Sequence, residues 1–143
     1  MNDHINNGRR HAANIGLWAL QILTAAAFLL AGSAKLIGQP VMVEMFEKLG
    51  VGQWFRYATG AIEVASAILL VIPRLSPIGA ALLVCTMSGA VMGHLLFLQG
   101  SAAAALVLGC FAALILWGRF AILKTWFASL RGKHGLEEAA AES

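Results

Sequence analysis

Three ionisable side chains within or beside long apolar segments are the first candidates for chemistry in this 143-residue chain: Lys35, Glu63 and His94. A charged group in the core of a bilayer is costly, so it usually faces other helices rather than lipid. Glu63 is the only formally charged residue between Arg56 and Arg74, and its helical neighbours are small or polar, which favours packing against another helix. Glu63 then either forms a structural hydrogen bond or carries a proton or binds a ligand.

Lys35 and His94 each have two interpretations. Lys35 stands at the end of an apolar segment, where a lysine can extend its ammonium group to the membrane surface. Its helical face continues through Thr24 and Gln21 as a sparse polar stripe, which instead favours an inward side chain near Glu63. His94 is either a hydrogen-bonded structural residue or a ligand or proton shuttle. A cluster of Lys35, Glu63 and His94 is geometrically possible, because all three fall in the same half of the bilayer.

Glycines indicate where helices can approach each other closely. Gly60 lies three residues before Glu63, about one helical turn, and Gly89 and Gly93 form a G-x-x-x-G spacing just before His94. We predict that these three glycines lie at contacts between helices.

No pattern of a known catalytic or metal centre is present in the sequence. The two cysteines, Cys85 and Cys110, form no C-x-x-C motif and have no histidine at metal-ligand spacing. Both lie in apolar segments, and we interpret them as small buried hydrophobic residues. The phosphate-binding glycine loop, G-x-S-x-G and H-E-x-x-H are also missing. We therefore predict no catalytic residue, no metal ligand and no enzymatic activity of the chain on its own.

The composition indicates a membrane protein. Hydrophobic residues make up 59% of the chain and charged residues 12%, against ~45–50% and ~25% in ordinary soluble domains. The net charge is +3, but the basic residues flank apolar segments instead of joining aromatic residues on a polar face, which excludes nucleic-acid binding.

The spacing of the apolar segments predicts an all-α membrane protein, a four-transmembrane-helix bundle with a short interfacial helix between the first two spans. A helix needs ~20 residues to cross the bilayer core, and the uncharged stretch 75–118 is divided at Gln99-Gly100-Ser101. The predicted organisation is a segment 1–13, a membrane domain 14–123 with spans at about 14–35, 55–72, 77–98 and 102–123, an interfacial helix at about 40–49, and a basic interfacial segment with a disordered tail at 124–143.

The distribution of Lys and Arg predicts the orientation. Basic residues are more numerous around the two termini and the loop that holds Arg74 than around the interfacial helix. Basic loops remain in the cytoplasm. We therefore predict an integral protein of a bacterial cytoplasmic membrane with both termini in the cytoplasm.

Several short motifs, taken in order, resemble the DoxX-like family of small membrane proteins over about residues 15–120. The resemblance rests on the segments 31–36, 46–50, 60–65, 72–74 and 87–90, followed by His94. It implies a four-helix membrane domain in which Lys35, Gly60, Glu63 and His94 match characteristic positions of the family. Some members resemble subunits of quinone-linked sulfur oxidoreductases, others are associated with oxidative-stress complexes, and animal relatives include an assembly chaperone for nicotinic receptors.

Three functions are compatible with these features. The first is an accessory subunit of a membrane redox system, with a quinone as the candidate cofactor and a redox protein as the partner. The second is a noncatalytic factor for the assembly of, or interaction with, another membrane protein. The third is a small transporter, which is disfavoured because the sequence has no convincing internal repeat.

Overall fold

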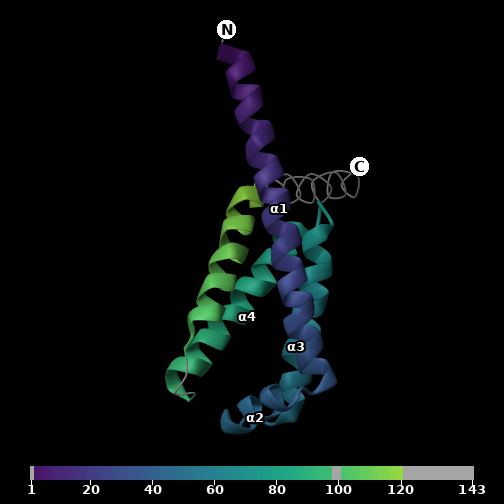
Figure 1. The fold of residues 1–143 in the computed structure, drawn as a ribbon, viewed down its shortest axis with the longest axis vertical. Helices are drawn as coiled ribbons and strands as arrows, with labels where there is room; N and C mark the ends of the chain where they lie inside the picture. Colours follow the sequence, from purple (N-terminus) through teal and green to yellow (C-terminus); the bar gives the residue numbers. More distant parts are fainter. Residues whose placement is uncertain (1, 98–100, 121–143) are drawn as a thin grey trace, which may run out of the picture.

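The computed structural model describes residues 2–97 and 101–120. Their helices are α1 (Asn2–Ile37), α2 (Pro40–Lys48), α3 (Gln53–Val71) and α4 (Ser76–Leu96). A further helix contains Ala103–Phe120 and is called the fourth span here. No strand occurs in these two ranges. Figure 1 shows α1, α3, α4 and the fourth span side by side, with α2 across one end, and the start of α1 and Phe120 toward the other.

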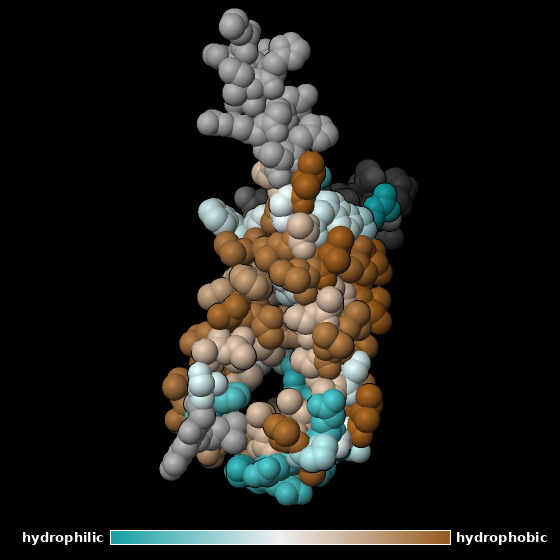
Figure 2. Space-filling view, viewed as in Figure 1, coloured by the Kyte–Doolittle hydropathy of each residue, from teal (hydrophilic) through white to brown (hydrophobic). Residues whose placement is uncertain are grey.

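Four of these helices are long and apolar enough to cross a membrane: α1 from Ala13 to Ile37, α3, α4 and Ala103–Phe120. Their outer faces expose many large hydrophobic side chains, which form the brown surface of Figure 2. A water-soluble monomer rarely exposes so large an apolar surface, whereas a bilayer covers it. The predicted fold class, a four-helix membrane bundle with a short helix after the first span, is confirmed.

The helices pack through small residues at their crossing points. α1 and α3 are antiparallel, and a Cβ atom on Gly32 would lie 2.8 Å from Val64 Cγ2 and 2.9 Å from the Gly60 oxygen. α3 and α4 cross at Gly79, where an added Cβ would lie 2.7 Å from the Ser66 oxygen. The largest apolar side chains of the core are fully buried: Phe28, Leu70, Leu83 and Ile115. Without a hydrophobic force between helices in lipid, such close packing supplies much of the association energy.

The short helix α2 folds back against the start of α3. Gly38 (φ +79°) and Gly52 (φ +84°) take the left-handed backbone conformation on either side of it, which glycine adopts without strain. Phe46 is the buried residue of α2, and its ring centroid lies 6.2 Å from that of Phe55. The remaining side chains of α2 are exposed or half-buried, as in a helix that lies along a membrane surface.

The structure overturns the expectation for the two cysteines, and other predicted features lie outside its range. Cys85 and Cys110 are exposed on the bundle surface and are not buried hydrophobic residues. Apolar residues on all sides of a membrane helix give no periodicity that separates lipid-facing from core positions, so the sequence could not place these thiols. The predicted turn at Gln99-Gly100 and the segment 124–143 lie outside the described residues.

Candidate functional site: a buried Lys35–Glu63 pair

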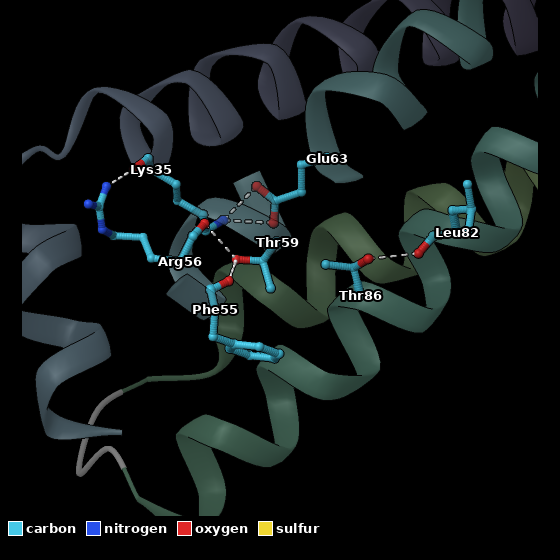
Figure 3. Close-up of polar contacts among 7 residues, drawn as sticks. All are labelled: Lys35, Phe55, Arg56, Thr59, Glu63, Leu82 and Thr86. Carbon is cyan, nitrogen blue, oxygen red and sulfur yellow. Dashed lines mark hydrogen bonds and ion pairs between the residues drawn. The ribbon is translucent and has the colours of Figure 1, made fainter. Parts of the chain in front are cut away.

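A buried ion pair joins α1 to α3 near the end of the bundle that α2 crosses, called the α2 end here. Lys35 Nζ donates to both carboxylate oxygens of Glu63, at 2.6 Å to Oε1 and 2.5 Å to Oε2. The side chain of Glu63 is 1% exposed and that of Lys35 is 14% exposed. The pair, drawn in Figure 3, closes a contact between residues 28 positions apart in the chain.

Two glycines make room for this pair. The contact of Gly32 with Gly60 brings the backbones of α1 and α3 together one turn from Lys35 and Glu63. A Cβ atom on Gly60 would lie 3.0 Å from the Cβ of Lys35, where larger residues would push the two helices apart. An ion pair with such short distances requires a fixed separation between α1 and α3, because a buried charge is tolerated only with well-placed partners.

Arg56 adds a second buried cation beside the pair. Its residue exposure is 3%, and its Nη1 donates to the backbone oxygen of Lys35, one of the last carbonyls of α1. Nε donates to Gln53 Oε1 at 2.7 Å, and the guanidinium lies 4.2 Å from the ring centroid of Tyr57. No carboxylate contacts Arg56 among the described residues. The two cations and one carboxylate therefore give this buried group of three side chains a formal net charge of +1.

His94 is not joined to the pair. Its Nδ1 donates to the carbonyl oxygen of Ala90 at 2.9 Å, within α4, and within residues 2–97 and 101–120 no hydrogen bond or ion pair links it to Lys35 or Glu63. Because a carbonyl can only accept, Nδ1 carries the proton in this contact and Nε2 is left for another partner. His94 lies two turns after the buried Met87 on α4, so it shares the inward face of that helix.

A hollow lies between α3 and the later part of α4. The two helices cross at Gly79, near the start of α4, whereas Gly93 near its end meets Leu49, just after α2, where an added Cβ would lie 3.3 Å from Leu49 Cδ2. Figure 2 shows an opening through the molecule beside α2, with hydrophilic residues at its rim. The helices thus separate toward the α2 end, on the side to which His94 belongs.

The three glycines expected at helix contacts behave differently. Gly60 lies at the α1–α3 crossing, as described above, and Gly93 meets the Leu49 side chain rather than another spanning helix. Gly89 is exposed, and among the described residues no atom outside its own helix lies within 4 Å of an added Cβ, so it makes no contact with another described helix. The G-x-x-x-G spacing of α4 is therefore not an internal packing motif.

A second polar contact occupies the opposite end, called the Arg119 end here. Gln21 is fully buried; its Nε2 donates to the Leu70 oxygen at 2.7 Å, which satisfies one of the last carbonyls of α3. Its Oε1 accepts from Arg119 Nε at 2.9 Å and Nη2 at 2.7 Å, and Arg119 Nη1 donates to Asn14 Oδ1 at 3.0 Å. This contact fixes α1 to both α3 and the fourth span.

The sequence predicted the contact between Lys35 and Glu63 but not the inward positions of two arginines. Lys35 does turn inward toward Glu63. No role inside the bundle is predicted from the sequence for Arg56 and Arg119, although both arginines make contacts there. One signal was available for Arg56, which lies seven residues before Glu63 and therefore on the same face of α3.

Comparison with known proteins agrees with this architecture. The model of the DoxX-like family matches residues 19–118, which include the Lys35–Glu63 pair, Arg56 and His94. No curated protein and no solved structure matches the chain. With the match covering more than half of its length, this integral membrane protein belongs to the DoxX-like family.

Proposed function

We propose that this protein is an accessory subunit of a membrane redox system and binds the polar head of a quinone in the hollow between α3 and α4. The main observation that supports this proposal is the buried Lys35–Glu63 pair, which joins α1 to α3. A buried ion pair adds little to stability compared with apolar packing, so its presence in a membrane core favours a role in binding or in proton handling.

The groups available suit a ligand with two carbonyl oxygens and an apolar tail. Lys35 Nζ has three N–H bonds, two of which go to Glu63, so one is left for a ligand oxygen. His94 Nε2 offers a second polar atom from the α4 side. The tail would lie among the apolar outer faces of the helices, and a partner oxidoreductase would supply the electrons.

Equilibrium binding of a short-chain quinone to the purified protein in detergent tests this proposal. Glu63→Gln and Lys35→Met should each weaken binding about tenfold or more, because each removes a charged hydrogen-bonding partner. The matched controls are Glu44→Gln and Lys48→Met, which break the exposed pair of α2, whose Nζ–Oε1 distance is 2.7 Å. Equal affinity in all five proteins, or no binding by the wild type, would contradict the quinone site.

A second candidate, a noncatalytic assembly or interaction factor, is favoured by the outer face of α4. Cys85, Gly89 and Met92 are exposed along one side of that helix, and Gly89 leaves open space beside its backbone. Small residues on a lipid-facing surface allow another membrane helix to approach closely. Gly89→Leu should then abolish co-purification of a membrane partner, whereas the quinone proposal expects quinone affinity to be unchanged by it.

The orientation and location are also proposals. We propose that the Arg119 end faces the cytoplasm, because basic residues gather there and basic segments remain inside. Accessibility of single cysteines introduced at Gly52 and at Asn14, in a variant without Cys85 and Cys110, tests this in intact bacterial cells. A membrane-impermeant thiol reagent should label the Gly52 position and spare the Asn14 position, and the reverse pattern would contradict the orientation.

A further inference from the structure

Two buried hydroxyl groups in the middle of the bundle have no hydrogen-bond partner in the part of the chain that the structure describes. Thr24 on α1 is 1% exposed and Ser66 on α3 is 0% exposed, and neither Thr24 Oγ1 nor Ser66 Oγ is bonded to another atom of the structure. Hydroxyls in membrane helices usually donate to a carbonyl of their own helix, as Thr86 does to Leu82 at 2.9 Å. An unpartnered buried hydroxyl is costly, which points to an occupant such as water.

The register of α1 and α3 places these hydroxyls between the two polar ends of the bundle. Lys35 pairs with Glu63 toward the α2 end, and Gln21 donates to the Leu70 oxygen toward the Arg119 end. Thr24 is three residues from Gln21, and Ser66 is three residues from Glu63. Each step is therefore about one helical turn, ~5 Å along the axis.

The register of α1 and α3 therefore orders these positions from one polar end to the other within a core that is otherwise apolar. Phe28 fills the face of α1 between Thr24 and Lys35, and at that level Ser66 on α3 continues the series. One water molecule that makes two hydrogen bonds of ~2.8 Å joins oxygens ~5.5 Å apart, which matches the spacing of one turn. Waters in such sites usually make about three hydrogen bonds and are held by otherwise unpaired polar groups.

We propose that Thr24 and Ser66 bind internal water that connects Glu63 to the Arg119 end, so that protons cross the bundle along this series. A proton enters from water at the Arg119 end, and each water or hydroxyl oxygen accepts one proton and releases another to the next. The Glu63 carboxylate accepts the proton, which breaks its ion pair with Lys35. It then releases the proton to water at the α2 end, and the ion pair forms again. The protein ends in its starting state, and no oxidant or reductant takes part.

This inference deepens the proposed function, since a group that protonates a bound quinone needs a supply of protons, but the two can fail separately. Quinone affinity depends on Lys35 and Glu63 and should be unchanged in Thr24→Val and Ser66→Ala. If the wild-type protein binds no quinone but still conducts protons, the proposed function is rejected and the proton path is not.

Proton flux into liposomes that contain the full chain tests the path directly. A pH-sensitive dye is trapped inside, a pH step is applied outside, and valinomycin with potassium removes the membrane potential. Wild-type liposomes should equilibrate faster than protein-free liposomes. Thr24→Val and Ser66→Ala should each slow this protein-dependent rate about tenfold, because a proton must then cross a gap left by a lost hydrogen bond.

Matched controls remove hydroxyls of the same kind that are already satisfied within α4. Thr86 donates to Leu82, and Ser88 donates to the Val84 oxygen at 2.8 Å. Thr86→Val and Ser88→Ala should keep the wild-type rate. Equal rates in all variants, an equal slowing by the controls, or a wild-type rate no greater than that of empty liposomes would overturn the inference.

Melting temperature provides a second measurement that does not depend on flux. If water bridges the hydroxyls, Thr24→Val and Ser66→Ala remove its hydrogen bonds and lower the melting temperature. If the hydroxyls are dry, the same substitutions remove an unpaired polar group and raise it. A higher melting temperature in both variants would therefore also overturn the inference.

Discussion

Gly32 on α1 lies against the backbone of Gly60 on α3, so closely that a Cβ added to Gly32 would stand 2.9 Å from the Gly60 oxygen. The adjacent turn of each helix carries one member of the Lys35–Glu63 pair. The ion pair therefore depends on two residues that have no side chain. The separation of the two helices, more than the charges themselves, sets the geometry of the site.

Gly32→Ala should destabilise the bundle by about 1–3 kcal/mol, the usual cost of an added methyl group in a filled interior. The added Cβ would meet both Val64 and Gly60 and push α1 away from α3. Unfolding in mixed detergent micelles provides the measurement. Gly16→Ala in the same helix is the control, because no described atom outside the backbone of that helix lies within 4 Å of the added Cβ. An equal loss in both variants would disprove this account of the crossing.

Lys35→Met should cost about 3–5 kcal/mol, since it leaves a buried carboxylate without its partner. The double variant Lys35→Met/Glu63→Met should be more stable than Lys35→Met alone, because no buried charge is then left unpaired. Unfolding of both variants in detergent checks this order. Lys48→Met breaks an exposed pair and should change stability by about 0.5 kcal/mol or less.

Arg56→Lys should lower stability by about 1–3 kcal/mol although the charge is kept. The single ammonium nitrogen of a lysine does not reproduce the separate positions of Nε and Nη1, from which the guanidinium donates to Gln53 and to the Lys35 carbonyl. The melting temperature of the purified protein is the readout. Arg74→Lys changes an exposed arginine and should leave it unchanged, and a similar fall in the two variants would show that the hydrogen bonds of Arg56 contribute nothing.

Gln21→Leu should destabilise the Arg119 end by about 1–3 kcal/mol, because the Leu70 carbonyl and Arg119 both lose a partner. Hydrogen exchange of backbone amides locates the effect, and the faster exchange should appear near the end of α3. Gln39→Leu, which alters an exposed glutamine outside the helices, should leave that exchange unaltered. Wild-type exchange in Gln21→Leu would contradict the role of this contact.

Replacement of both cysteines by alanine should change the unfolding free energy by about 0.5 kcal/mol or less, the usual effect at a surface position. Both thiols are exposed on the apolar outside of the bundle and are not bonded to each other. A loss of several kcal/mol in the double variant would show that they lie at buried contacts after all.

Spans, α2 and the Lys35–Glu63 contact could be predicted from the sequence because each follows from one strong energetic rule. Apolar length gives the spans, and the cost of a charge in lipid turns Glu63 inward and brings a cation to it. The polar stripe through Thr24 and Gln21 gave the buried face of α1 correctly, since both residues are buried.

The inward arginines and the outward small residues could not be predicted in the same way. Arg56 and Arg119 stand near the ends of spans, where a cation can face either the headgroups or the bundle, and the choice depends on which oxygens the neighbouring helices offer. Gly89 and Cys85 lie in a helix that is apolar on every side. Only the positions of the other helices determine which of its faces meets lipid.

The pairing of α1 with α3 joins two helices of unequal apolar length. The apolar part of α3 has 19 residues and that of α1 has 25, or ~28 Å and ~37 Å at the helical rise, on either side of the ~30 Å of an average hydrocarbon core. Since tight contacts at both ends hold these helices together, neither can adjust to the membrane alone. Lipid chains must instead shorten beside α3 and extend beside α1, and the protein is expected to collect in membrane regions whose lipids allow this uneven thickness.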